Sequence, residues 1–230
     1  MVSGVIQAQD FFNTQLDTTV FKTDTIFKNR FMVVTYLDVE SNNKLVVSFD
    51  SKSLKPDGTC IYSGRNGIIV EGAYKSGVLV GEWIEKDKSD SIHKKVNYDY
   101  KSLIVSKDSL NFKNKMQSNN KDYLIVAEMP NFKNGDIYEF SRYIKENIFY
   151  PASFRFFYKN NKKMKVFVQF EIIDFTKVAN VRCVGGNKIN DLEYEAKRLI
   201  YSTQGLWRNA MHRGKCSDVT LTFPIIFKTE

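Results

Sequence analysis

The chain has little histidine and cysteine, and this scarcity argues against several kinds of chemistry. Only two histidines, His93 and His212, occur among 230 residues, and both lie in polar stretches typical of a solvated surface. The three cysteines, Cys60, Cys183 and Cys216, are far apart with no CxxC spacing, so neither a zinc site nor a disulfide framework is expected. No nucleophile elbow or phosphate-binding glycine loop occurs. The sequence therefore predicts a protein that is not an enzyme and has no metal site and no cofactor.

A long apolar run is also missing. No stretch reaches the roughly eighteen apolar residues that a membrane-spanning helix needs, so the chain as given is not expected to span a bilayer. Residues 1–10 form a short apolar stretch that resembles the end of a secretory signal peptide cleaved after Ala8. The alternative is an N-terminus with no role. The first interpretation predicts a periplasmic or envelope-associated protein.

Charge of one sign predominates only modestly. The net charge is +8, and most of the excess falls after residue 119. Such a surplus favours acidic partners but falls short of a nucleic-acid-binding signature, so no nucleic-acid partner is expected. Acidic residues on one helix face, such as Asp191 and Glu195, are expected to face solvent.

Glycine is concentrated in one region, where the sequence predicts a sheet of β-hairpins. Six of the twelve glycines lie between residues 57 and 85, among short runs of β-type residues. Asn66-Gly67 and Ser76-Gly77 suit tight hairpin turns, because these residues tolerate positive φ. Gly58 and Gly81 begin similar segments 23 residues apart, and the pattern resembles the MORN-type repeats of bacterial envelope proteins. A glycine-rich meander outside any family is the alternative.

The hairpin region is expected to extend over residues 1–112 as one antiparallel sheet. Residues 30–38 and 44–50 are rich in β-branched and aromatic residues and are separated by a polar turn. A single hairpin cannot bury its own apolar face, so stacking of neighbours is needed for stability. Tyr62, Tyr74 and Trp83 are therefore predicted to be packing residues.

A polar segment over residues 113–122 is predicted to be a linker to a second domain over residues 123–230, which is expected to fold independently. Capping-box pairs, Asp136 with Glu139 and Asn190 with Glu193, predict two helix starts in that domain. The predicted order is a helix over 137–148, strands over 165–174 and 178–184, a helix after Asn190, and a strand over 217–228. The fold class is thus α+β, with a hairpin sheet followed by two helices and a three-stranded antiparallel sheet.

The last predicted strand places apolar residues alternately, with Val219, Leu221 and Phe223 on the core side. Pro224 interrupts the other set. Because proline has no N–H, it is largely confined to sheet edges, so this strand is expected to have one unpaired side.

Seven short motifs in order and register resemble the TonB C-terminal family over nearly the whole of residues 123–230. They are Met129-Pro130, Gly135-Asp136, Tyr150-Pro151, Val166 to Phe170, Asp191-Leu192 with Ala196, Trp207 with Ala210 and Gly214, and Phe223 to Phe227. The chain departs from the family at Lys162-Lys163-Met164 and Thr176-Lys177, where the family usually has glycines, and at Asn209, which replaces a common proline. These departures put the usual partner preference in doubt.

The resemblance implies that a protein or peptide segment, such as part of an outer-membrane transporter, pairs with the edge of the last strand. The implied binding residues are Asp218, Val219, Thr220, Leu221 and Thr222. Alternatively, this edge is solvated or covered by the N-terminal domain. A free edge also allows a homodimer. The chain shows neither the membrane helix nor the long extended linker of an energy transducer. It is therefore expected to hold a partner in the envelope without transducing energy, with the hairpin sheet as a second contact surface.

A basic aromatic stretch over residues 154–163 suggests a second role. Arg155, Lys159, Lys162 and Lys163 lie beside phenylalanines and tyrosine, a combination that can contact an anionic lipid surface. The alternative interpretation places the aromatic residues in the core and the lysines in a solvated turn.

Overall fold

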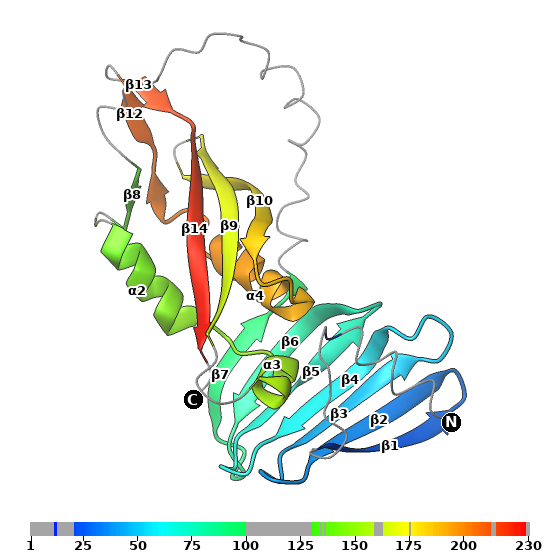
Figure 1. The fold of residues 1–230 in the computed structure, drawn as a ribbon. Coiled ribbons are helices and arrows are strands. Elements are labelled where there is room, and N and C mark those ends of the chain that lie inside the picture. Colours follow the sequence, from blue (N-terminus) through cyan, green and yellow to red (C-terminus); the bar gives the residue numbers. More distant parts are fainter. Residues whose placement is uncertain are drawn as a thin grey trace.

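The computed structural model describes residues 12, 21–99, 130–133, 135, 137–158, 163–174, 176–212 and 215–228. The fold class is α+β, as predicted: a seven-stranded antiparallel sheet comes first, and three helices and smaller antiparallel sheets follow in the described residues (Figure 1). Residues 1–10, the linker at 113–122 and Asp136 lie outside the described residues, so the signal-like segment, the domain boundary and the first capping box stay predictions.

The first sheet is a meander in which each strand pairs with the next. Its strands are β1 Phe21–Lys28, β2 Phe31–Asp38, β3 Lys44–Asp50, β4 Pro56–Ser63, β5 Ile69–Lys75, β6 Val78–Lys86 and β7 Ile92–Asn97. Ser76 and Gly77, which join β5 to β6, have φ values of 49° and 83°, as a tight hairpin turn of this twist requires. Gly58 and Gly81, the pair that defined the 23-residue offset, also both have positive φ.

One face of this sheet forms a core. Burial alternates along β2 and β3, so that Tyr36 and Phe49, for example, are fully buried. Tyr62, Tyr74 and Trp83 are buried on the same side, which confirms the prediction that they are packing residues. Gly72 in β5 lies directly under the ring of Trp83 in β6: a Cβ at Gly72 would be 2.1 Å from Trp83 Cδ2. The absence of a side chain at this position lets the indole lie flat on the neighbouring strand.

The C-terminal part has the predicted elements in the predicted order, with one helix and four short strands that were not predicted. Its elements are β8 Asn131–Phe132, α2 Ile137–Asn147, α3 Ala152–Phe157, β9 Lys163–Ile173, β10 Lys177–Gly186, α4 Asn190–Tyr201, β11 Trp207–Arg208, β12 Ala210–His212, β13 Lys215–Ser217 and β14 Val219–Lys228. The main sheet has the strand order β10-β9-β14. The short helix α3 was not predicted, and β10 continues through Gly185 and Gly186 where the sequence predicted its end.

The C-terminal core is built mainly from the alternating residues of β9 and from the two longer helices. Val166, Val168, Phe170 and Ile172 are all fully buried, as the alternation predicts. Phe140 of α2 packs against them, with its ring centroid 6.1 Å from that of Phe170. The predicted cap of α4 is wrong: the helix begins at Asn190 itself, the N-cap is Ile189, and no side chain caps it.

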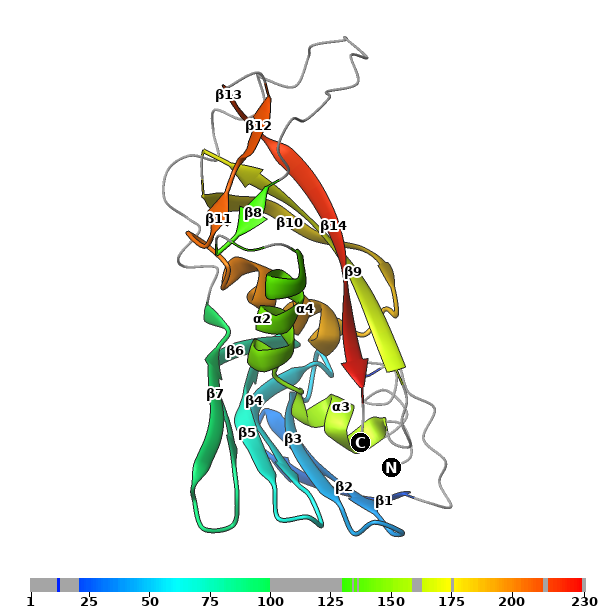
Figure 2. The ribbon, with the colours of Figure 1, turned by 90° about the vertical axis from the view of Figure 1, so that its left-hand side faces the viewer.

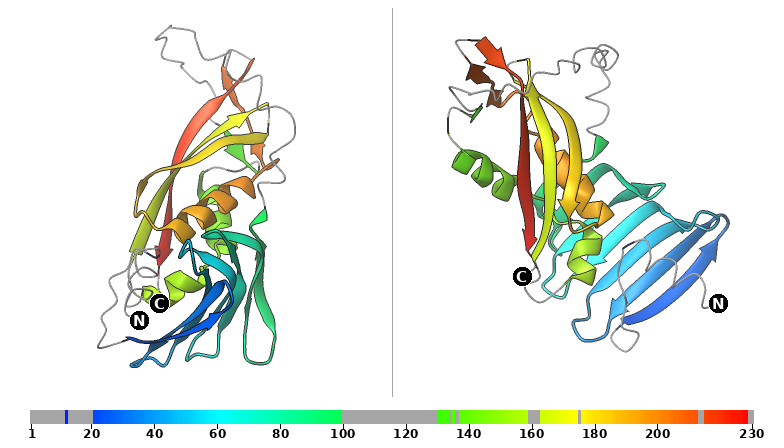
Figure 3. Two further views of the ribbon diagram at one scale, coloured as in Figure 1. Left: turned by 90° about the vertical axis from the view of Figure 1, so that its right-hand side faces the viewer. Right: turned by 45° about the horizontal axis from the view of Figure 1, so that its top comes forward.

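The two parts of the molecule share a core. Phe149, Ala152 and Phe156, from α3 and the segment before it, are completely buried in the core of the seven-stranded sheet. Figure 3 shows α3 and one end of α4 lying against that sheet. Lys94 of β7 adds polar contacts by donating hydrogen bonds to the carbonyls of Glu146 and Ile148 at 2.9 and 2.7 Å. Independent folding of the C-terminal part stays a prediction, and it would require these surfaces to be exposed to water.

The close approach of Trp83 to Gly72 yields the first testable prediction. We expect Gly72→Ala to lower the free energy of unfolding by about 1–3 kcal/mol, because the added methyl group forces the indole off the strand. Gly185→Ala is the control: its Cβ would meet nothing closer than Phe167 at 3.8 Å, so its effect should stay within about 0.5 kcal/mol. Urea denaturation of both variants measures the difference. Equal effects would contradict the packing role of Gly72.

Candidate functional site

The last strand forms one edge of the C-terminal sheet. β14 pairs with β9 over ten consecutive residue pairs, from Val219 with Ile172 to Lys228 with Lys163, without a register shift. Among the described residues no strand pairs with its other side. Figure 2, a view from the side on which β14 lies in Figure 1, shows this strand along the margin of the sheet. β14 therefore lies at an edge of its sheet, as Pro224 indicated.

The opposite edge of the sheet is irregular. β10 has two register shifts against β9, and Asn180 within it has a φ of 51°. Bulges and twists of this kind protect a sheet edge from pairing with another chain. The two edges therefore differ, and β14 is the one that keeps a regular extended backbone.

The five residues implied as partner-binding lie together at the start of β14. Asp218 immediately precedes the strand and is exposed, as are Thr220 and Thr222. Val219 and Leu221 are half-buried and face the core side, as predicted. The structure thus brings the predicted residues into one contiguous edge segment.

The basic aromatic stretch is divided between core and surface. Phe154 and Phe156 are 1% and 0% exposed. Arg155 forms an ion pair with Glu85 of β6 at 2.5 Å, which satisfies its charge within the molecule. Lys163 is exposed at the start of β9, and Lys159 and Lys162 lie outside the described residues.

Two carboxylates predicted to face solvent are instead buried, which is the main correction to the sequence analysis. Asp191 is 1% exposed and Glu195 is 0% exposed. They lie on the face of α4 that meets the seven-stranded sheet, while Leu192 and Ala196 on another face pack into the C-terminal core. One feature of the sequence could have indicated this burial. It is the i, i+4, i+7 spacing of Asp191, Glu195 and Arg198, which places all three on one helix face.

Glu195 is fully paired. Both of its oxygens accept hydrogen bonds from Arg198, at 2.7 and 2.8 Å. Tyr98, just after β7, donates to it at 2.8 Å, and the backbone N–H of Phe149 donates at 2.7 Å. Burial alone would lower the pKa of Arg198, but the hydrogen bonds and attraction from Glu195 raise it above its usual value. Arg198 therefore stays charged, and the cluster ties α4 both to the end of the first sheet and to the segment before α3.

Asp191 is paired at only one oxygen. Oδ2 accepts hydrogen bonds from the Tyr74 hydroxyl at 2.5 Å and from the Ser153 hydroxyl. Oδ1 is buried and has no hydrogen-bond partner among the described residues. Burial raises the pKa of this carboxyl from 3.8 to about 6, although both hydroxyl bonds act in the opposite direction.

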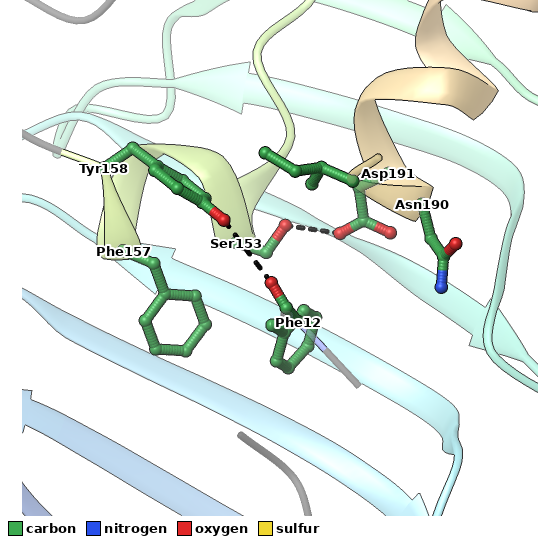
Figure 4. Close-up of a pocket in the computed structure, with 7 residues that line it drawn as sticks. Phe12, Ser153, Phe157, Tyr158, Asn190 and Asp191 are labelled. Atoms are coloured by element: carbon green, nitrogen blue, oxygen red, sulfur yellow. Dashed lines mark hydrogen bonds between the residues drawn. The ribbon is translucent and has the colours of Figure 1, made fainter. Parts of the chain in front are cut away.

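A narrow crevice lies beside this carboxyl, between α3 and the start of α4. It is a shallow gap between side chains with no room for a water molecule (Figure 4). Its aromatic lining is Phe12, Phe157 and Tyr158, and its polar lining includes Ser153 and Asp191. Phe12, from the N-terminal segment, was not predicted to have a role; it is buried against the sheet, and its carbonyl accepts a hydrogen bond of 3.5 Å from Tyr158.

Three further observations concern the described part of the chain. No group of three or more His, Cys, Asp or Glu residues there could hold a metal ion. His93 lies 3.3 Å from Asp87 on the surface. Within the same residues, no helix has both the length and the apolar character needed to cross a membrane.

Comparison with known proteins does not assign the chain to a family. No family model matches it, and neither the curated proteins nor the solved structures include a match. The function must therefore be argued from the β14 edge and from the buried carboxylates.

The Glu195 cluster yields a prediction about stability. We expect Arg198→Met to lower the free energy of unfolding by about 3–5 kcal/mol, because it leaves the Glu195 carboxylate buried without a cation. The double variant Glu195→Gln with Arg198→Met should recover part of this loss, since the uncompensated charge is gone. Guanidinium denaturation measures all three proteins. A double variant no more stable than the single one would refute the electrostatic explanation.

Asp191 yields a prediction about pH. Because its pKa is raised in the folded state, the folded protein binds this proton more tightly than the unfolded chain does. The stability it contributes is therefore complete below about pH 4 and is lost as the pH rises through about 6, a change of about 3 kcal/mol. Asparagine cannot titrate, so the stability of the unaltered protein relative to Asp191→Asn should fall by that amount between pH 4 and 7.5.

The neighbouring groups should not obscure this titration. Tyr74 and Cys60 face Asp191 from the sheet, Tyr158 from the end of α3 and Tyr194 from α4 itself, and burial raises the pKa of each. All four are therefore neutral throughout this pH range. Urea denaturation at several pH values tests the prediction, and a stability difference that does not vary with pH would contradict it.

Proposed function

We propose that this protein is a non-catalytic bacterial envelope protein, located in the periplasm, that binds an extended segment of a partner protein along the free edge of β14. The regularity of that edge carries the proposal, because an unpaired extended strand offers its main-chain groups to another chain. The resemblance of residues 123–230 to the TonB C-terminal family supports it and suggests an outer-membrane transporter as a partner. A second copy of the chain could use the same edge.

Pro224 indicates which residues offer those groups. In an antiparallel ladder, main-chain N–H and C=O groups point alternately towards the two neighbouring strands. Proline cannot donate to β9, so its nitrogen is expected to face the free side. By alternation, Thr220 and Thr222 then present both N–H and C=O to that side, whereas Leu221 and Phe223 bond to β9.

This arrangement limits the strength of binding. Two complete residue pairs, at Thr220 and Thr222, correspond to four main-chain hydrogen bonds, each contributing about 0.5–1.5 kcal/mol. Their sum falls short of the roughly 8 kcal/mol that a micromolar complex requires. Side-chain contacts must supply the rest, and the exposed Ile226 further along the same face is suited to do so.

A substitution at the edge tests the proposal. We expect Thr222→Pro to fold, because it removes an N–H that faces outwards, and to lose at least tenfold in affinity for an envelope partner. Thr222→Val, which keeps the N–H, should bind like the unaltered protein. Pull-down from an envelope extract, followed by titration of the captured protein, measures the effect. If Thr222→Pro binds the partner as tightly as the unaltered protein does, the β14 edge is excluded as the binding site.

Amide hydrogen exchange provides a check that needs no partner. The amides of Thr220 and Thr222 should exchange quickly in the free protein, whereas those of Leu221 and Phe223 should be protected by their bonds to β9. A bound partner should slow the exchange of the Thr220 and Thr222 amides only. Protection of all four amides in the isolated protein would mean that the edge is already covered.

An alternative function, contact with an anionic envelope or membrane surface, draws support from one cluster. Lys163 lies opposite Lys228, and Lys165 opposite the exposed Ile226, with Lys165 Nζ 5.6 Å from the ring centroid of Phe167. Arg155 is less suited to this role because Glu85 neutralises it. Loss of envelope binding in Lys163→Glu but not in Thr222→Pro would favour this alternative.

A further inference from the structure

The strand β1 forms a free edge of the seven-stranded sheet. It pairs with β2 without a register shift, from Phe21 opposite Asp38 to Lys28 opposite Phe31. Among the described residues no strand pairs with its other side. Figure 1 shows β1 at the margin of that sheet, on the side away from the C-terminal sheet. This edge is therefore distinct from the edge of β14.

Two observations indicate which main-chain groups of β1 face its free side. β1 and β2 are joined by a two-residue turn, in which Asn29 has a φ of 55°. In such a hairpin the two residues that flank the turn bond to each other. By alternation, Thr25 and Phe27 then present their N–H and C=O groups to the free side. In agreement with this orientation, the N–H of Thr25 donates a hydrogen bond of 2.8 Å to the side chain of Asp24.

The edge also exposes large apolar side chains on both faces of the sheet. Phe27 is 67% exposed, although it lies on the core face opposite the buried Met32. Ile26 is 52% exposed on the other face, opposite Val33. An exposed edge strand with apolar side chains is a site at which another chain can pair.

The sequence of β1 is complementary to itself in one antiparallel register. A two-fold pairing must place the residues with free main-chain groups opposite each other. When the two-fold axis passes through Ile26, Thr25 of each copy lies opposite Phe27 of the other, which meets this condition. The two Ile26 side chains then face each other, and Asp24 of each copy lies opposite Lys28 of the other. Opposite charges and apolar pairs in such positions stabilise a sheet.

The neighbouring registers are less favourable. Moving the axis back by one residue places Lys22 opposite Lys28, and moving it back by two places the two Asp24 carboxylates together; like charges directly opposite are destabilising. Moving it back by three pairs Asp24 with Lys22, but both exposed apolar side chains then lie opposite residues that precede β1. Moving it forward by one sets Ile26 opposite Lys28 and runs into the turn.

We propose that β1 pairs with β1 of a second copy of this chain, in the register centred on Ile26, so that the two seven-stranded sheets form one continuous sheet. Thr25 of each copy exchanges two main-chain hydrogen bonds with Phe27 of the other. Asp24 releases the N–H of Thr25 and pairs instead with Lys28 of the second copy. The β14 edge of each copy stays free, so this pairing does not depend on the function proposed for that edge.

Sedimentation equilibrium of the full-length protein tests whether the dimer forms. Because two short strands bury a small area, we expect a weak dimer, with a Kd of about 10–200 µM. Thr222→Pro alters the β14 edge and should dimerise like the unaltered protein. The proposal is overturned if the protein stays monomeric well above that concentration range, or if Thr222→Pro abolishes the dimer, since the contact would then involve β14.

A charge exchange tests the register. Asp24→Lys and Lys28→Asp should each weaken dimerisation about tenfold, because each places like charges at both junctions of the dimer. An equal mixture of the two variants should recover the affinity of the unaltered protein, since both junctions of the mixed dimer then join opposite charges. In the register that pairs Asp24 with Lys22, Lys28→Asp would have no effect and the mixture would not recover. Either of those results overturns the proposed register.

A cross-link tests the centre of the contact. In the proposed register the two Ile26 Cα atoms are about 4.5 Å apart, as in other pairs that do not share hydrogen bonds, and a disulfide can span this distance. Ile26→Cys should therefore form a covalent dimer on mild oxidation with diamide. Asp24→Cys is the control, because it lies on the same face but about 13 Å from its counterpart. Both variants also carry Cys216→Ser, which removes an exposed thiol. Equal cross-linking of the two variants, or none in Ile26→Cys, would contradict the pairing.

Discussion

The buried contact between α4 and the seven-stranded sheet is the interaction on which the rest of the structure depends. Glu195 and Arg198 of α4 meet Tyr98 and the backbone of Phe149, so that one ion pair joins the helix to the end of the sheet and to the segment that leads into α3. A buried ion pair is not in itself strong evidence of stability, because both charges lose water. Its importance is geometric: each group is satisfied only when the two parts of the molecule are docked in this one way.

That constraint gives α4 two buried faces. Leu192, Ala196 and Leu199 pack into the core of the C-terminal sheet, whereas Asp191 and Glu195 point to the other sheet. The helix therefore fixes the C-terminal sheet relative to the first one. The long edge of β14 is held on a rigid support, which lowers the entropic cost of pairing with an extended segment. The incompletely paired Asp191 lies within the same junction, beside the crevice.

Much of the fold could be predicted from the sequence, because it follows from short-range patterns. The alternation in β9 and β14 predicted which residues are buried, and Pro224 predicted a sheet edge. Ser76-Gly77 predicted a hairpin turn. The interpretation of Asp191 and Glu195 failed because it assumed that a helix has one buried face. The helix α3 also escaped prediction, since its six residues are too few to show a helical period.

The sequence by itself determined the long central strands and their inward faces, the two longer helices and the edge position of β14, since each depends on residues that are neighbours along the chain. Only the tertiary structure decided that α4 lies between two cores, that Arg198 neutralises Glu195 while no cation among the described residues pairs with Asp191, and that Phe12 reaches the crevice between α3 and α4. These features arise from contacts between residues separated by up to about 146 positions, as for Phe12 and Tyr158. A local pattern carries no information about such pairs, because the energy of a buried charge depends on which distant groups surround it after folding.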